Sequence, residues 1–324
     1  MVYAIRIEEH GGPEVLRWVE VDLAEPQAGE VRIRTSAAGL NYIDTYHRSG
    51  LYGIDLPSGL GLEGVGIVEA VGSGVQGFSA DDRVGMFGPA LGAYATHRNI
   101  PADQLIRIPD GIDDETAAAL LLKGCTAQAL IENCAKVEAG QSVLVYAASG
   151  GVGHIMTGWL NAIGASVIGV VGSEEKAQAA LGNGAAHVIR HDEEEIAARI
   201  REITDGAGVP VIFDGVGKAT WTASLDSASR RGLIVSYGNA SGPVNDVALG
   251  TLAQKGSLFV TRPTLFDYVA GEGGRQKSAD RLFAMVEQGA VKPEIGQRFA
   301  LRDAAEAHRA IEASETQGAT VLLP

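Results

Sequence analysis

The stretch from Ser142 to Gly153, SVLVYAASGGVG, constrains the fold of this chain more than any other segment. Val143, Leu144 and Val145 form an apolar run typical of a buried strand, and a helix-compatible segment, 154–163, follows the glycines. A strand, a tight glycine turn and a helix start form the first half of a dinucleotide-binding βαβ unit. The alternative, a glycine turn that binds no ligand, is disfavoured because strands are predicted both before and after it.

The residue types in this turn suit a bound anion. Ala148 and Gly150 are small enough to let the backbone approach a pyrophosphate, and Gly153 lets the helix pack closely on the strand. The free N–H groups at the helix start, together with the helix dipole, hold the negative charge. Ala148 stands where the strict G-x-G-x-x-G pattern has its first glycine, so the match to that pattern is imperfect.

Charge and hydrophobicity limit the class of protein. The chain has 324 residues, enough for about two domains, and 46% hydrophobic with 20% charged residues is typical of a globular protein. Its net charge of −14 argues against nucleic acid or an anionic membrane surface as the main partner. The first residues are charged and no apolar run reaches about 18 residues, so we expect neither a signal peptide nor a membrane span. We expect a soluble, cytoplasmic protein.

The two cysteines, Cys125 and Cys134, are too few for a metal cluster or a disulfide framework. If their segment is helical, their Cα atoms lie about 13 Å apart along the axis, which is too far for a disulfide between them. We interpret both as packed or partly exposed thiols in a reducing compartment.

The pattern along the chain predicts a β-rich region followed by an α/β region. Residues 1–100 contain alternating or glycine-studded strand segments of the kind found in small barrels: 3–7, 31–35, 61–75, 82–85 and 93–97. An Ala- and Leu-rich helix is predicted over 112–134. From 142 onward, the predicted strands (143–146, 166–171, 187–189, 211–213, 232–237, 257–261) alternate with the predicted helices (154–163, 176–181, 194–204, 219–229). This alternation predicts a doubly wound parallel sheet. Two more helices (278–288 and 304–314) and a final strand (319–323) follow.

The segment after the second predicted strand of the sheet favours NADPH over NADH. Gly172 stands where an NAD-specific unit has an acidic residue that binds the ribose 2′-hydroxyl. Ser173 can donate a hydrogen bond to a 2′-phosphate, and Lys176 supplies a positive charge. His191, after the next strand, closes the same pocket in this interpretation. The alternatives stay open that Lys176 is an exposed surface lysine and that His191 is an ordinary loop histidine.

Four motifs together resemble a known family: AASGGVG (147–153), GLNYIDTYHRSGLY (39–52), LKGCTA (122–127) and GSLFVTRPTL (256–265). They are similar to the quinone oxidoreductases, the zeta-crystallin-like, zinc-free branch of the medium-chain dehydrogenase/reductase superfamily. The resemblance covers nearly the whole chain. It implies a GroES-like catalytic domain over 1–122, a Rossmann domain that binds NADP over 123–262, and a segment over 263–324 that returns to the catalytic domain. It also implies a homodimer.

The resemblance assigns roles to individual residues. The residues implied beside the nicotinamide and the substrate are Asn41, Asp44, Tyr46 and Tyr52, although Tyr46 and Tyr52 read equally well as half-buried aromatics of the β-rich domain. The residues implied to bind the cofactor, besides Asn41, are Lys123, Thr126, Gly150, Gly151, Val152, Gly172, Ser173, Lys176, His191, Val216, Tyr237, Asn239, Phe259, Val260, Thr261 and Gln317. Members that prefer NADPH commonly have tyrosine at the position of His191, and this difference weakens the predicted cofactor preference without reversing it.

The residues at the zinc positions argue against a metal. Zinc-dependent relatives place a cysteine near the N-Y-I-D motif and have G-H-E where this chain has Gly61-Leu62-Glu63. Asn41 and Leu62 occupy those two positions, and neither is an ordinary zinc ligand. His47, Asp44 and Glu63 remain as conceivable ligands, but such side chains without thiols are more often hydrogen-bonding or surface groups. We therefore expect NADPH and no zinc.

The function expected from the resemblance is zinc-independent transfer of hydride from NADPH to a quinone. Tyr46 and Asn41 are the candidate hydrogen-bond donors to the developing oxyanion. One alternative is an NADPH-dependent reductase of alkenals or other enones. Another is a non-catalytic protein that binds RNA or serves as a crystallin. The net charge of −14 and the lack of a basic stripe disfavour RNA binding.

Overall fold

The computed structural model describes all residues from Met1 to Pro324, which form two compact units. The first unit comprises Met1–Cys125, Val269–Ala284 and Pro293–Pro324, and the second comprises Thr126–Tyr268 and Met285–Lys292. The domain boundaries predicted from the sequence stay predictions. The compact units differ from them most at Met285–Lys292, which belongs to the second unit.

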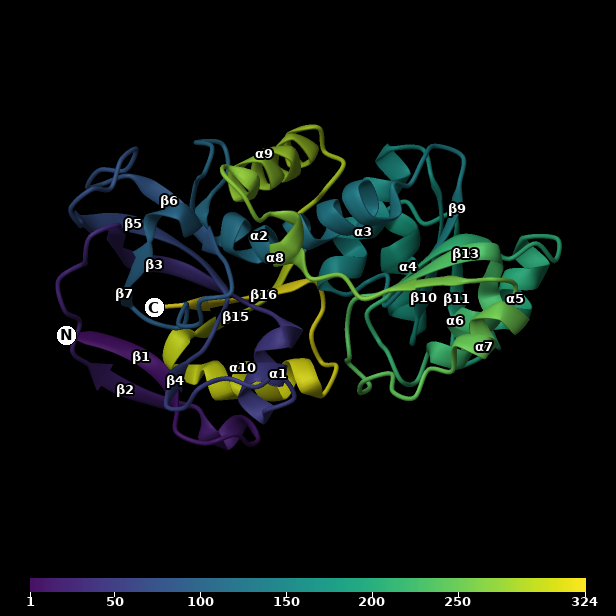
Figure 1. Cartoon of the computed structure of the whole chain (residues 1–324), viewed down its shortest axis with the longest axis horizontal. Helices are drawn as coiled ribbons and strands as arrows, with labels where there is room; N and C mark the ends of the chain where they lie inside the picture. Colours follow the sequence, from purple (N-terminus) through teal and green to yellow (C-terminus); the bar gives the residue numbers. More distant parts are fainter. The chain divides into compact units, whose positions relative to one another are not determined.

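The first unit is built on two sheets (Figure 1). The smaller has the strand order β2 (Arg17–Val21), β1 (Val2–Ile7), β4 (Ser58–Gly59). The larger has the order β15 (Ile295–Ala300), β16 (Ala319–Leu323), β3 (Glu30–Leu40), β5 (Glu63–Val71), β6 (Arg83–Phe87), β8 (Leu105–Arg107), and β7 (His97–Pro101) also pairs with β3.

Strand β3 is longer than the predicted strand 31–35. Its side chains alternate between buried and less buried as far as Thr35, as a half-buried strand requires, and the residues from Ala37 to Leu40 are then all buried. Small Ala and Gly residues fit such a two-sided interior, so the pairing with β5 continues to Gly39, which is opposite Glu63.

The predicted strand 93–97 is wrong. β7 begins only at His97, and Tyr94 and Ala95 lie in a loop in which Ala95 forms an isolated bridge with Ala4. The loop conformation buries the Tyr94 ring completely, and the Tyr94 backbone bonds Leu60 and Ile5 in place of a strand partner.

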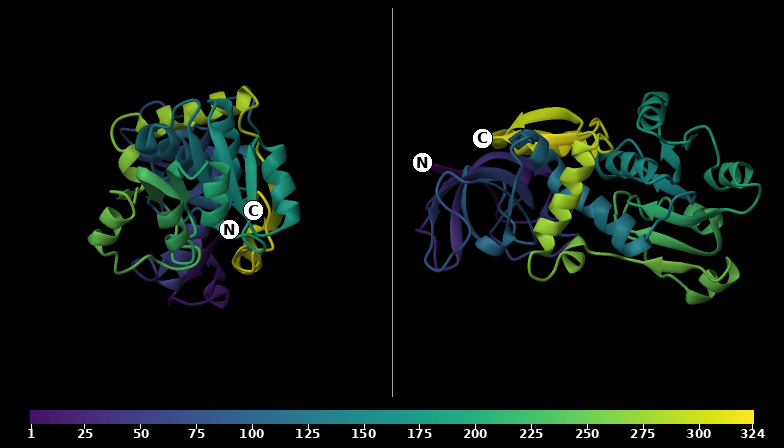
Figure 2. Two further views of the ribbon diagram at one scale, coloured as in Figure 1. Left: turned by 90° about the vertical axis from the view of Figure 1, so that its right-hand side faces the viewer. Right: turned by 90° about the horizontal axis from the view of Figure 1, so that it is seen from above.

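Helices and 3-10 turns join the strands of the first unit. The helices are α1 (Tyr42–Ser49), most of α2 (Asp114–Gln128), most of α9 (Gly274–Glu287) and α10 (Ala304–Glu312), and the 3-10 turns are Pro13–Val15, Ala102–Gln104 and Leu301–Asp303. Helices α2 and α9 lie close together (Figures 1 and 2). They pack closely at Gly124 of α2, where a Cβ atom would lie 2.4 Å from the Leu282 side chain of α9. The predicted helix 112–134 is α-helical only to Gln128 and continues as a π-helix, Ala129–Ala135.

The second unit is a six-stranded parallel sheet. Its strand order is β11 (His187–Arg190), β10 (Ser166–Val171), β9 (Ser142–Tyr146), β12 (Val209–Asp214), β13 (Ala228–Ser236), β14 (Phe259–Thr261). The strands alternate with α3 (Gly151–Ala162), α4 (Glu174–Gly182), α5 (Ile196–Ile203), α6 (Trp221–Ser227) and α7 (Leu249–Gln254), and α8 (Leu265–Tyr268) follows. In sequence order the sheet reads 3-2-1-4-5-6, the doubly wound Rossmann order, and the predicted fold class is confirmed.

Most element boundaries in this unit differ from the prediction by one to four residues, and two of these differences have a clear structural cause. The helix predicted to reach residue 229 ends at Ser227, because Ala228 already pairs with Val209 in the parallel ladder. The strand predicted from 257 begins at Phe259, since Ser257 has a left-handed backbone with φ 59°.

Two further observations bear on the sequence expectations. No helix has both the length and the apolar character needed to cross a lipid bilayer. Both cysteines are free thiols, with Cys125 fully buried.

Candidate cofactor and substrate site

The glycine turn lies at the carboxyl end of β9, between β10 and β12, where the strand order of the sheet reverses. Ala147 takes a left-handed conformation with φ 51°, and its carbonyl accepts a bond from Gly150 N at 2.8 Å. A Cβ atom on Gly153 would lie 2.1 Å from that carbonyl oxygen, so only glycine fits there. The turn therefore brings the first turn of α3 against the strand end, as a dinucleotide fold requires.

The start of α3 is open to an anion. Gly150 is the N-cap and supplies no side-chain acceptor, and no acidic residue lies in the first turn. The first N–H groups of a helix have no partner within the helix, so those of Gly151 and Val152 remain to bind a ligand oxygen. A pyrophosphate fits this cradle chemically.

The residues predicted to bind a 2′-phosphate meet at the carboxyl ends of β10 and β11. Ser173 caps α4, and its Oγ accepts a bond from Lys176 N at 3.3 Å. A Cβ atom on Gly172 would lie 2.8 Å from His191 Nε2, so the imidazole fills the space that Gly172 leaves. Lys176 is half-buried and His191 is exposed.

The remaining predicted cofactor residues of this unit lie in α2, after β12 and β13, or on β14. Val216 lies in the turn after β12, and Tyr237 packs its ring against Gly215. Asn239 follows β13, and Thr126 lies in the last turn of α2. On β14, Phe259 and Val260 have exposed fractions of 57% and 38%, and Thr261 is half-buried.

Sequence reasoning missed Asp214, which organises the turn after β12. Its buried carboxylate accepts bonds from the backbone N–H groups of Val216 at 2.9 Å and Gly217 at 3.0 Å. The hydroxyls of Thr220 and Ser224 also donate to it. An acid at the end of an otherwise apolar strand was the available signal for this role.

In the first unit, Asn41 and Asp44 stand at the beginning of α1. Asp44 Oδ2 accepts bonds from Asn41 N at 2.9 Å and from the Tyr94 hydroxyl at 2.7 Å. Burial raises the pKa of Asp44 to about 7, although both donors act to lower it. The Asp44 carboxyl is fully buried, so it is placed to hold the first turn of α1.

Glu63 is the second residue that sequence reasoning missed as a site member. Its fully buried carboxylate accepts bonds from Asn41 Nδ2 at 2.6 Å, Lys123 Nζ at 3.1 Å and Leu122 N at 2.6 Å. Two residues predicted at the cofactor thus share one carboxylate. A Cβ atom on Gly39 would lie 2.3 Å from Glu63 Oε1, so the adjacent strand needs glycine to leave room for it.

The predicted tyrosines form an aromatic group with their neighbours. Tyr46 and Tyr52 pack edge to face with ring centroids 5.2 Å apart, and Tyr42 lies 5.6 Å from Tyr46. Tyr46 is buried and Tyr52 half-buried, which fits both interpretations given to them from the sequence. Gln317 is exposed just before β16.

The residues of this region do not fit a zinc ion. Asn41 uses its amide N–H on Glu63, and Leu62 is a buried apolar side chain. The carboxylates of Asp44 and Glu63 accept the bonds described above, and nowhere in the chain do three His, Cys, Asp or Glu side chains gather as a metal site requires.

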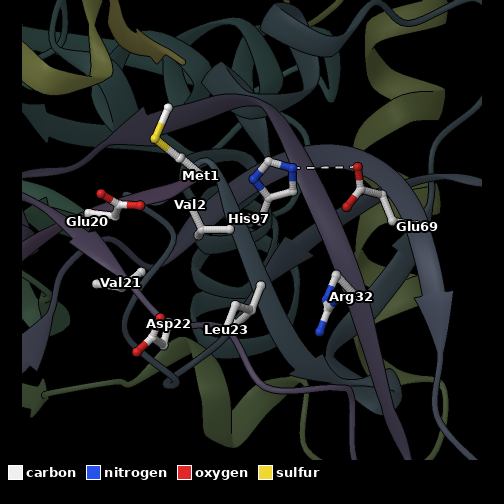
Figure 3. A pocket seen from close by; sticks show the side chains of 9 residues that line it. All are labelled: Met1, Val2, Glu20, Val21, Asp22, Leu23, Arg32, Glu69 and His97. Atoms are coloured by element: carbon white, nitrogen blue, oxygen red, sulfur yellow. Dashed lines mark ion pairs between the residues drawn. The ribbon is translucent and has the colours of Figure 1, made fainter.

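A separate pocket of about 360 Å³ lies in the first unit beside the N-terminal segment, β2 and β7 (Figure 3). An ion pair at 3.5 Å joins His97 and Glu69 there, and Glu20, Asp22 and Arg32 also line it. It contains none of the predicted site residues and no aromatic ring except the His97 imidazole, so it does not suit a planar aromatic ligand.

Two family models match the two parts of the chain. Residues 27–110 match the alcohol dehydrogenase GroES-like domain, and residues 151–278 match the zinc-binding dehydrogenase domain. With the Rossmann strand order, they define a two-domain oxidoreductase of the medium-chain dehydrogenase/reductase superfamily.

Whole-chain relatives narrow the assignment. The quinone oxidoreductase of Pseudomonas aeruginosa is 50% identical over 325 residues, covering 100% of both chains. The crystal structure of Escherichia coli quinone oxidoreductase complexed with NADPH superposes with a TM-score of 0.97 at 46% identity, covering 99% of this chain and 100% of that one. The 2-haloacrylate reductase of a Burkholderia species is 41% identical, covering 100% of this chain and 99% of that protein. The chain belongs to the quinone oxidoreductase family, so the expected family is confirmed.

Proposed function

We propose that this protein is an NADPH-dependent, zinc-independent quinone oxidoreductase. The observation that carries the proposal is the turn from Ala147 to Gly153, whose close packing and open helix start suit a dinucleotide pyrophosphate. The relatives named above support the same cofactor and substrate class. When bound, NADPH supplies a hydride equivalent to the acceptor.

The chain's own residues bind and orient the reactants in this proposal. The backbone N–H groups of Gly151 and Val152 hold the pyrophosphate, which the missing side chain of Gly150 allows to come close. Ser173 and Lys176 meet the 2′-phosphate. Asn41 and Tyr46 donate hydrogen bonds to the acceptor oxygen as negative charge develops on it, and Tyr52 stands near the acceptor. Glu63 orients the Asn41 amide by accepting one of its N–H groups.

A quinone needs little help beyond this positioning. Its reduced product is a phenol-like anion whose conjugate acid has a pKa near 10, as for tyrosine, so a strong Lewis acid is not required. Holding two planar molecules in register accounts for most of the expected rate acceleration.

The direct test is oxidation of NADPH and of NADH with 1,4-benzoquinone after exhaustive treatment with a metal chelator. We expect activity that is insensitive to chelation, with kcat/KM at least about tenfold higher for NADPH. Activity that disappears with chelation and returns with zinc contradicts the proposal, and so does failure to bind either coenzyme.

A second candidate function is reduction of the carbon–carbon double bond of an activated alkene. The similarity to the 2-haloacrylate reductase favours it. A substrate panel with NADPH separates the two functions, because an alkene reductase turns over acrylates and alkenals faster than quinones.

We also propose that the protein works in the cytoplasm as a homodimer. Two free thiols suit a reducing compartment. The edge strand β14 exposes Phe259 and Val260, and an exposed apolar edge is normally covered by another chain.

A further inference from the structure

One cation in the second unit holds three carboxylates together beside the predicted 2′-phosphate residues. Arg190 ends β11, opposite Val171 at the end of β10. Its guanidinium lies 3.3 Å from Glu174 Oε2, 2.7 Å from Asp192 Oδ2 and 2.8 Å from Glu193 Oε1. The Arg190 side chain is 22% exposed, whereas its three partners are between 39% and 63% exposed.

This cluster adjoins the phosphate residues along both chain segments. Glu174 directly follows Ser173 at the start of α4, and His191 directly follows Arg190. His191 in turn fills the space beside Gly172. A phosphate bound by Ser173, Lys176 and His191 is therefore next to the cluster formed by Arg190, Glu174, Asp192 and Glu193.

The local charge is unfavourable for a phosphate without Arg190. Segments 172–176 and 190–194 contain five acidic residues and only two basic ones, Lys176 and Arg190, so their net charge is −3 with Arg190 and −4 without it. A phosphate monoester carries a charge between about −1.5 and −2 at neutral pH. Physiological ionic strength does not fully screen the repulsion between a phosphate and carboxylates that lie within a Debye length of about 8 Å.

We propose that Arg190 determines specificity for the phosphorylated coenzyme by neutralising and holding the carboxylates of Glu174, Asp192 and Glu193. Arg190 is a positioning residue: it acts through these acids and leaves the phosphate to Ser173, Lys176 and His191. The inference rests on the proposed function, since it concerns discrimination between NADPH and NADH at that same site.

The three carboxylates are neutralised by their pairing with the Arg190 guanidinium. The bond from Arg190 holds the pKa of Asp192 below its usual range. Exposed ion pairs of this kind contribute little to folding stability. Their effect in this place is on the electrostatic potential that a bound anion meets.

The test measures binding of two probes by calorimetry: 2′,5′-ADP, which carries the 2′-phosphate, and 5′-AMP, which lacks it. For Arg190→Gln at low salt we expect the Kd of 2′,5′-ADP to rise about five- to tenfold and that of 5′-AMP to change less than about twofold. Adding Glu174→Gln to this variant should recover about threefold of the loss. The preference in kcat/KM for NADPH over NADH should fall in parallel.

Lys255→Gln is the matched control. Lys255 caps the C-terminus of α7 and pairs with Asp226, so this substitution also removes one positive charge from an ion pair. The pair lies on the β14 side of the sheet, whereas Arg190 lies on β11 at the opposite edge. The affinities of this variant for both probes should equal those of the unsubstituted protein. Three results would overturn the inference. Arg190→Gln could weaken the binding of both probes equally, it could weaken the binding of neither, or adding Glu174→Gln could fail to recover the affinity for 2′,5′-ADP. Failure of the unsubstituted protein to prefer 2′,5′-ADP would instead overturn the proposed NADPH function.

Discussion

Glu63 shows how one buried carboxylate organises several groups of a site. It receives three donors, two from side chains and one from the backbone, and none of them comes from its own strand. Loss of Glu63 would leave the buried Lys123 ammonium without its carboxylate, which is costly, and would also release the Asn41 amide. The donors lie 22, 59 and 60 residues away along the chain, which explains why local sequence patterns did not reveal this role.

The hydroxyl of Tyr46 is proposed to donate a hydrogen bond during the reaction, and its removal tests this role. If it donates to the acceptor oxygen, Tyr46→Phe should lower kcat by about 10-fold, less than the loss for a full oxyanion-hole donor, because a quinone oxyanion is already stable. Steady-state kinetics with NADPH and 1,4-benzoquinone measure this. Tyr42→Phe is the control, since Tyr42 lies on the same helix 5.6 Å away and has no assigned role. A loss of many orders of magnitude would point to obligate proton donation by Tyr46.

Two buried groups of the first unit oppose each other in the pH dependence of stability. Burial raises the pKa of Asp44 to about 7, so between about pH 4 and 7 the folded state holds a proton that the unfolded chain has lost. Burial, aided by the charge of Arg48, lowers the pKa of His308 to about 3, so below about pH 6.5 the unfolded chain binds a proton that the folded state lacks. Stability falls with rising pH through Asp44 and rises through His308.

The two effects cancel between about pH 4 and 6.5, and single substitutions should separate them. Asp44→Asn should leave the His308 effect alone, so that the free energy of unfolding rises by about 1.4 kcal/mol per pH unit over this range. His308→Gln should give a fall of similar slope up to about pH 7. Urea denaturation at a series of pH values measures both. Parallel stability curves for the two variants and the unsubstituted protein would show that neither group titrates as described.

At the scale of elements, the turn between β9 and α3 depends on Gly153. A Cβ atom at this position meets the Ala147 carbonyl oxygen at 2.1 Å, so Gly153→Ala must push the helix away from the strand. We expect a loss of about 2 kcal/mol in unfolding free energy and at least a tenfold weaker affinity for NADPH. Denaturation and fluorescence titration measure these.

The control for this substitution is Gly182→Ala, at the end of α4. A Cβ atom on Gly182 has no neighbour within 4 Å, so this change should be neutral or stabilise the protein by about 0.5 kcal/mol. Unaltered NADPH affinity in Gly153→Ala would mean that the turn does not hold the cofactor.

Elements with a clear local pattern could be predicted, and those set by distant pairing could not. β10 and β16 have the bounds that their apolar runs predicted. Residues 228 and 229 were predicted to end a helix, but the pairing of Ala228 with β12 makes them the beginning of strand β13. The glycine turn was likewise readable from local sequence, whereas the roles of Glu63 and Asp214 depend on which donors the fold brings to them.

At the scale of the whole molecule, each compact unit is discontinuous in sequence. The chain leaves the first unit after Cys125, returns at Val269, and contributes Met285–Lys292 to the second unit before its last return. Composition changes along the chain marked the main transition near residue 112–134. They could not mark an eight-residue return such as Met285–Lys292, because its assignment depends only on which residues surround it.

The proposed dimer forms through the exposed edge of β14. β14 is the last strand of the parallel sheet and pairs only with β13, so its outer edge has unpaired backbone groups beside the exposed Phe259 side chain. If a second copy covers this edge, Phe259→Glu places a charge in the interface and should raise the dimer dissociation constant at least about 100-fold. Light scattering coupled to size-exclusion chromatography should then report the mass of one chain. Leu181→Glu, which adds the same charge at a 43% exposed leucine on α4, should keep the mass of two chains. A Phe259→Glu variant that remains dimeric at micromolar concentration would show that the two copies meet through another surface.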